Sequence, residues 1–182
     1  MTIRISIPTR EVVSQATRQI LADYHTDWDG PHWVFSMAWN AGTGQLAPLT
    51  AALITNDVPP TTYPAHLARI ASEEAAGGKQ AYLYMVMIEM WGVTVDPTAD
   101  QAQVAQLKRE HRARRLHLHP ERMEIVSVFT ADIHQRLWVT TKYRNRPDDI
   151  QQQFYGDPDR EQIPRGNMIT AIRNAAAIAK AA

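Results

Sequence analysis

The chain of 182 residues has no cysteine, no long hydrophobic run and no excess of charge of either sign. Without cysteine there is no disulfide, no thiolate nucleophile and no cysteine-ligated zinc or iron–sulfur cluster, so a metal would need His, Asp or Glu ligands. The longest apolar stretch, near residues 81–91, is interrupted by Glu89 and is much shorter than the roughly 20 residues of a membrane-spanning helix. The sequence therefore predicts no membrane segment.

The 19 basic and 19 acidic residues cancel, so the whole protein should not be drawn to nucleic acid or anionic lipid. Only a local patch would provide such attraction. The first residues, MTIRISIPTREVV, lack the uninterrupted apolar core of a secretory signal, and we therefore expect a cytoplasmic protein. The 15 arginines against 4 lysines, with frequent alanine, fit a high-GC bacterial genome.

Hydrophobic periodicity predicts both strands and helices. Helices are predicted over residues 9–24, 63–76, 100–116 and 164–181, and strands over residues 3–7, 32–39, 46–55, 81–91, 122–130 and 137–144. The third helix has the capping-box spacing of Thr98 to Gln101. Pro48 leaves the segment 46–55 open between a strand and a short helix, with the strand favoured. Residues 145–163 are polar and rich in proline, which predicts an exposed loop.

This order contains no internal repeat and no regular alternation of single strands with single helices. It predicts one α+β domain over residues 1–182, with a mainly antiparallel sheet of about five or six strands and about four helices packed against it. The strand at 81–91, apolar on both faces, is predicted to be central and covered on both sides.

Two histidines lie one residue apart in the sequence HLHP. The spacing of His117, His119 and the next proline from Ser127 resembles part of the metal motif of the JAMM (MPN) metalloproteases. In that family two histidines and an aspartate bind zinc, so the resemblance implies metal-dependent hydrolysis. It covers about sixteen residues, and the family's aspartate position holds Thr130. Asp132 lies two positions further, roughly 7 Å along a strand, so we do not assign the chain to that family.

A looser metal hypothesis uses four side chains around the predicted hairpin of the last two strands. These are His117, His119, Asp132 and His134. Each pair has i, i+2 spacing, which places both members on one face of a strand. Imidazole and carboxylate ligands suit zinc, iron or manganese. No other cofactor is predicted, and the alternative interpretation of these residues is an ordinary join between a helix and a hairpin.

The run KREHRARR predicts a basic helix end. Its proposed polyanion-binding residues are Lys108, Arg109, Arg112 and Arg115. Three of them, at positions 108, 112 and 115, share one helix face. Such a patch can bind the phosphates of nucleic acid. Cations are also favoured at helix C-termini by the helix dipole, so a solvated face or an acidic protein partner explains the run equally well.

No complete catalytic constellation is present, and we identify no catalytic residue. The strand at 32–39 instead carries four large side chains on one face, Trp33, Phe35, Met37 and Trp39. Aromatic side chains are enriched at protein interfaces. The leading hypothesis is therefore a small binding or assembly protein that contacts a partner protein or its own copies, and not an enzyme. The alternatives are a metal-dependent hydrolase at His117 and His119 and a polyanion binder at the basic helix.

Overall fold

The structure is a computed structural model that describes residues 7–24, 31–54, 58–93, 98, 100–113, 115–157, 159–164 and 166–182. The strand predicted over residues 3–7 falls outside these ranges except for Ile7. Within them the protein forms one antiparallel sheet of six strands in the order β2-β1-β3-β4-β5-β6. The prediction of a single α+β domain is confirmed.

From the first helix onward, the strands and helices follow one another in the order that the periodicity predicts, with one strand added. The strands are β1 His32–Asn40, β2 Gln45–Ile54, β3 Leu83–Val93, β4 Arg122–Asp132, β5 Leu137–Tyr143 and β6 Arg146–Tyr155. The helices are α1 Arg10–Asp23, α2 Tyr63–Ala76, α3 Gln101–Arg112 and α4 Asn167–Ala181, with short 3-10 turns η1 Pro60–Thr62 and η2 Leu116–Leu118. No helix in the described part of the chain is long and apolar enough to cross a membrane.

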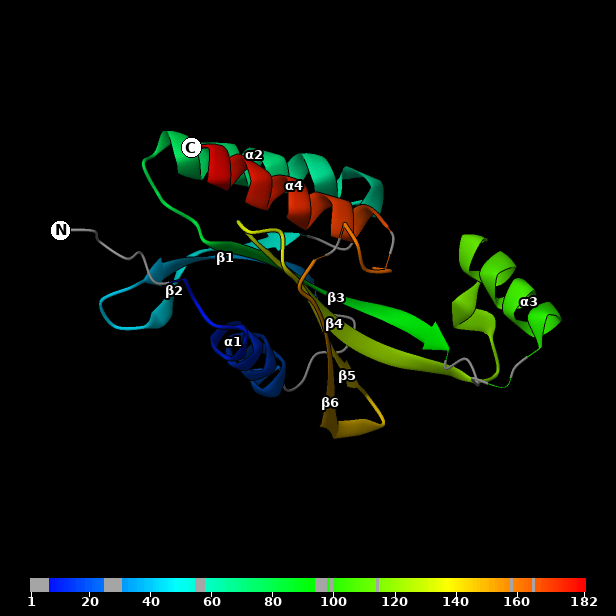
Figure 1. Cartoon of the computed structure of the whole chain (residues 1–182). Coiled ribbons are helices and arrows are strands. Elements are labelled where there is room, and N and C mark those ends of the chain that lie inside the picture. The colour runs from blue at the N-terminus through cyan, green and yellow to red at the C-terminus, as the bar shows by residue number, and fades with distance from the viewer. Residues whose placement is uncertain are drawn as a thin grey trace.

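The sheet lies between two helical layers, with α2 and α4 on one face and α1 on the other (Figure 1). Alternate side chains of β3 supply the two cores. Tyr84 and Val86 belong to the core under α2 and α4, whereas Met85 and Met87 belong to the core under α1. Both sets are buried, which confirms that residues 81–91 contain a central strand covered on both sides.

Beyond the body of the sheet, β3 and β4 continue as a two-stranded extension. β1 pairs with β3 only as far as Met87, and β5 pairs with β4 only from Ile125, while β3 and β4 stay paired out to Val93 and Arg122. The chain between these two ends forms α3 and η2, which stand apart from both helical layers (Figure 1). We call the described residues 88–93, 100–113 and 115–124 the arm.

The prediction of a loop over residues 145–163 was wrong, because residues 146–155 form β6 at the edge of the sheet. Among the described strands it pairs with β5 alone, and an early proline is tolerated in such an edge strand. Ile150 and Phe154 pack on the core under α1, whereas Gln151 and Gln153 are exposed. The many polar residues of this segment hid the alternation of packed and exposed side chains, and pairing with β5 stabilises the strand.

Three predicted features of helix ends also differ from the structure. The N-cap of α3 is Asp100, whose Oδ1 accepts the Gln103 N–H at 2.8 Å, and not Thr98 of the predicted capping box. The helix ends at Arg112 rather than 116, and η2 follows it. Helix α4 begins at Asn167 rather than 164, because Gly166 has a φ of +151°, which residues with a side chain rarely adopt.

Candidate interaction surfaces

The four histidine and aspartate residues of the metal hypothesis lie at opposite ends of β4. His117 is in η2 and His119 directly follows it, and the His119 Nδ1 accepts the Glu121 N–H at 3.1 Å. Asp132 ends the strand, roughly 33 Å away at about 3.3 Å per residue. The structure therefore does not bring the four together, and among the described residues no group of three His, Asp or Glu could hold a metal.

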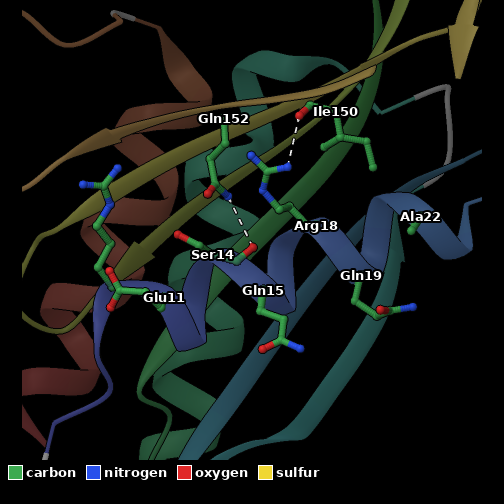
Figure 2. Close-up of a pocket in the computed structure, with 9 residues that line it drawn as sticks. Glu11, Ser14, Gln15, Arg18, Gln19, Ala22, Ile150 and Gln152 are labelled. Atoms are coloured by element: carbon green, nitrogen blue, oxygen red, sulfur yellow. Dashed lines mark hydrogen bonds between the residues drawn. The ribbon is translucent and has the colours of Figure 1, made fainter. Parts of the chain in front are cut away.

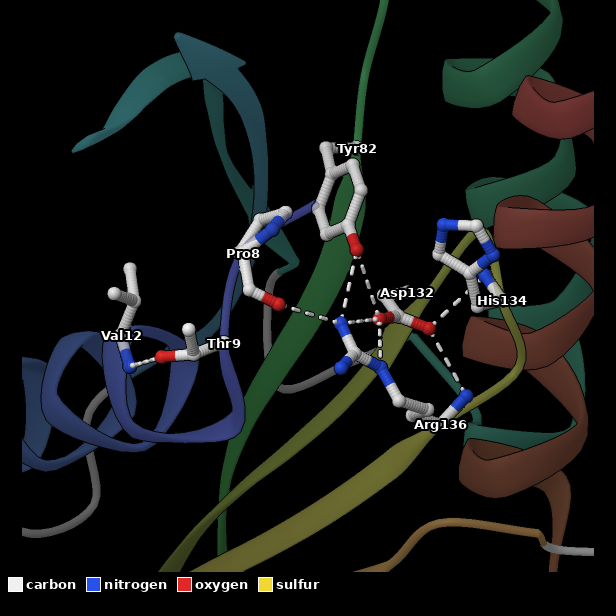
Figure 3. A network of polar contacts seen from close by, with 7 residues as sticks. All are labelled: Pro8, Thr9, Val12, Tyr82, Asp132, His134 and Arg136. Carbon is white, nitrogen blue, oxygen red and sulfur yellow. Dashed lines mark hydrogen bonds and ion pairs between the residues drawn. The ribbon is translucent and has the colours of Figure 1, made fainter. Parts of the chain in front are cut away.

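Asp132 instead belongs to a buried polar network that closes the β4–β5 turn (Figure 3). Its Oδ1 accepts the backbone N–H groups of His134 at 3.0 Å and Arg136 at 2.9 Å. Its Oδ2 accepts the Arg136 Nε–H at 2.7 Å and the Tyr82 hydroxyl at 3.3 Å. Burial, and then the Asp132 charge, raise the pKa of Tyr82. Because both carboxylate oxygens of Asp132 already accept hydrogen bonds from within the domain, we interpret this residue as structural and not as a metal ligand.

Sequence reasoning missed a second buried carboxylate. Glu74 of α2 is 5% exposed; its Oε2 accepts the Tyr84 hydroxyl at 2.8 Å, and its Oε1 accepts those of Thr50 at 2.5 Å and Ser36. Burial and the bond to Glu74 raise the pKa of Tyr84. A signal was available, since Glu74 lies seven residues after the buried Leu67, on the apolar stripe of its helix. The cluster ties α2 to β1, β2 and β3.

The residues predicted to bind polyanions lie on the arm. Lys108, Arg109, Arg112 and Arg115 are all exposed, and no ion pair joins any of them to another described residue. A groove of about 260 Å³ runs between α3, the end of β3 and η2. Its lining is Val93, Val104, Leu107, Lys108, His111, Arg112 and Leu116. Two of the four predicted cations therefore line an apolar groove, and the other two do not.

A second surface lies on the α1 side of the sheet, at the β2 edge. We call it the β1–β2 face, and its residues are Trp33, Phe35, Met37 and Trp39 of β1 with Leu46, Pro48, Ala51 and Leu53 of β2. The cross-strand register places these eight side chains on one side, and all are apolar. The Trp33 and Phe35 rings are stacked with centroids 6.0 Å apart, and Leu53 is 53% exposed.

The outer edge of β2 pairs with no strand in the described part of the chain; it is uncharged from Gln45 to Ile54 and is interrupted by Pro48. The Met37 carbonyl accepts the Tyr82 N–H at 2.7 Å, on the β3 side of β1. Pro48 pairs with Met37 from the other side, so its nitrogen faces the open edge, where the missing N–H breaks no ladder bond. This position explains how a proline fits the strand that the sequence favoured. A bulge at Ser36 and Met37 accompanies it.

A groove of about 510 Å³ lies between α1 and β6 (Figure 2). Arg18 Nη1 donates to the Ile150 carbonyl at 3.3 Å, and Gln152 Nε2 donates to the Ser14 carbonyl at 3.4 Å. The same Gln152 nitrogen donates to Thr17 Oγ1 at 2.7 Å. Ligand pockets are lined mainly by apolar side chains, whereas hydrogen bonds between α1 and β6 cross this groove. We therefore interpret the groove as the junction between the helix and the strand.

Comparisons of the chain with protein-family models, with curated proteins and with solved structures find no match. The conclusion about function therefore rests on the chain's own surfaces.

Proposed function

We propose that the protein is a binding or assembly protein that acts through protein–protein contact, with the β1–β2 face as its contact surface. One observation carries the proposal: an apolar sheet face with stacked Trp33 and Phe35 rings and a half-exposed Leu53 continues to an uncharged edge strand that pairs only with β1 among the described strands. Exposed apolar patches of this kind mark sites of protein association.

The β1–β2 face is partly covered, because α1 contacts β2 and five of its side chains, Trp33, Phe35, Met37, Trp39 and Leu46, pack against the core under α1. The dimensions of the sheet explain why this cover is incomplete. Six strands spaced about 4.8 Å apart span roughly 24 Å, whereas one helix is about 10 Å wide. On the far face α2 and α4 lie side by side and together cover most of that width. On the near face α1 is the only helix among the described residues, and Pro48, Ala51 and Leu53 at the β2 edge are exposed, so a partner would supply its cover there.

We propose that this partner is a second copy of the chain. The formal net charge is zero, so two copies do not repel each other at long range. No charged residue lies on β2, so two β2 edges can meet without like charges opposed. A two-fold axis places the same patch on both partners, and an all-apolar patch is complementary to itself. Because Pro48 has no N–H to donate in one half of the edge, pairing between the two β2 strands is confined to residues 50–54.

The mass in solution tests this proposal, measured by sedimentation equilibrium up to about 1 mM, where a Kd of 1 mM corresponds to about 4 kcal/mol. The expected mass is twice 20.6 kDa. Ala51→Lys places a charge on the β1–β2 face and should restore the monomer. Ala47→Lys is the matched control, since Ala47 is equally exposed on the same strand but on the opposite face. A wild-type protein that is monomeric throughout, or two variants that behave alike, would refute the proposal.

A further inference from the structure

Helix α3 is the one described helix that buries no residue. It stands at the end of the arm, away from both helical layers (Figure 1). An amphipathic helix normally packs its apolar stripe against a core. Here Val104 and Leu107 form the stripe and remain partly exposed. The arm therefore holds an apolar surface outside both cores of the domain.

The groove beside this stripe combines an apolar floor with a basic rim. Val93, Val104, Leu107 and Leu116 form the floor, and Lys108, His111 and Arg112 form the rim. None of the described lining residues is acidic. The volume of about 260 Å³ is below the roughly 300–1,000 Å³ of small-molecule sites. Such a groove suits the anchoring side chains of a peptide segment better than a cofactor.

The only acidic side chain of α3, Glu110, accepts the Gln106 Nε2–H at 3.0 Å on its own helix, and its Oε2 is buried without a hydrogen-bond partner among the described residues. Glu110 does not line the groove. Neither Lys108 nor Arg112 has an ion pair with a described residue. Two unpaired cations at the edge of an apolar surface attract carboxylates. The attraction between these cations and a carboxylate becomes stronger as the surface loses water on binding.

We propose that this groove binds an acidic amphipathic helix of a partner protein. Apolar side chains at i, i+3 or i+4, and i+7 would enter the groove, and flanking carboxylates would pair with Lys108 and Arg112. Nucleic acid fits less well, because phosphates gain nothing from the floor and would use Arg109 and Arg115 as readily as the two rim cations. This surface is separate from the β1–β2 face, so the inference does not depend on self-association.

A pair of double charge reversals tests the rim. The probe is a fluorescent synthetic helix of about 18 residues, or five turns, with leucines on one face and glutamates on the other. Lys108→Glu with Arg112→Glu should weaken its binding at least tenfold, measured by fluorescence anisotropy. Arg109→Glu with Arg115→Glu changes the net charge equally but lies outside the groove, and should weaken binding less than about twofold. Equal losses, or no binding by the wild type, would overturn the proposal.

A matched apolar pair tests the floor. Leu107→Ser should weaken binding of the same probe about tenfold or more, whereas Leu118→Ser, at a 66% exposed position of the arm outside the groove, should not. Circular dichroism checks whether each variant is folded. If Leu107→Ser is unfolded, the two charge-reversal variants still test the proposal. A DNA duplex of about 20 base pairs serves as the competing ligand. If DNA binds and displaces the peptide, with both charge pairs equally sensitive, the arm is a polyanion site instead.

Discussion

Arg136 Nε donates to the Oδ2 atom of Asp132 across the β4–β5 turn, and the two atoms lie 2.7 Å apart. Asp132 is fully buried, and Arg136 also donates through Nη2 to the Pro8 carbonyl at 3.1 Å. One guanidinium thus joins the hairpin turn to the segment that enters α1 (Figure 3). The aspartate that the sequence offered as a metal ligand is held by this pair.

Loss of Arg136 should strongly destabilise the protein. Arg136→Leu leaves a buried carboxylate without its cation, and breaking one side of a buried pair costs about 3–5 kcal/mol. The free energy of unfolding from urea titrations should fall by that amount. Arg69→Leu is the control, because the pair of Arg69 with Glu73 is about 60% exposed on both sides and should contribute less than about 1 kcal/mol. Equal effects would contradict the role of the network.

Lys142 of β5 caps the C-terminal end of α1. Its buried Nζ donates to the carbonyls of Leu21 at 3.1 Å and Tyr24 at 2.9 Å. Lys142→Met removes the cation and leaves carbonyls unsatisfied, so stability should fall by about 1–3 kcal/mol. Amide hydrogen exchange in the last turn of α1 should accelerate, while the exposed Lys180→Met leaves it unchanged. Unaltered exchange in Lys142→Met would show that this cap is dispensable.

Stability should fall in mild acid partly because of His32. Its ring contacts the Tyr63 hydroxyl and packs edge-on against the Tyr63 ring, and burial lowers its pKa below the usual value of about 6.5. The unfolded chain then binds the proton more readily. This contribution is complete above about pH 6.5 and is lost as the pH falls toward the lower pKa of the folded state.

Thermal unfolding between pH 7 and pH 5 measures this effect. His32→Gln, which cannot take up the proton, should show a smaller fall in unfolding temperature than the wild type. The exposed His117→Gln should follow the wild-type profile. Identical slopes for the wild type and His32→Gln would exclude His32 as a source of the acid sensitivity.

Pro48 should limit self-association through β2. Pro48→Val supplies the missing N–H at the open edge and extends the stretch that can pair with another strand. Light scattering should then detect tighter dimers or larger assemblies at the same protein concentration. An unchanged mass distribution would mean that the edge takes no part in association.

Most helices and strands could be predicted because their patterns are local. The stripe of Val13 and Leu21, the aromatic alternation after His32 and the stop at Gly77 each depend on neighbouring residues. The strand β6 could not be predicted, because its stability comes from pairing with β5. The end of α3 at Arg112 likewise depends on how the chain returns to β4.

The candidate surfaces show the same division. The basic cluster and the aromatic face were visible in sequence, since each consists of neighbours along one element. The sequence did not show which cations line a groove, because Val93 and Leu116 come close to Lys108 and Arg112 only when the arm folds. The engagement of Asp132 by Arg136 depended equally on the closing of a turn.

By itself the sequence determined the fold class, the central position of β3 and the absence of cysteine chemistry, because periodicity and composition are properties of the chain. Only the tertiary structure decided that His119 and Asp132 lie at opposite ends of β4 and that α3 projects from the domain. The physical reason is distance: which side chains meet is set by strand order and register, and these follow from contacts between residues far apart in sequence.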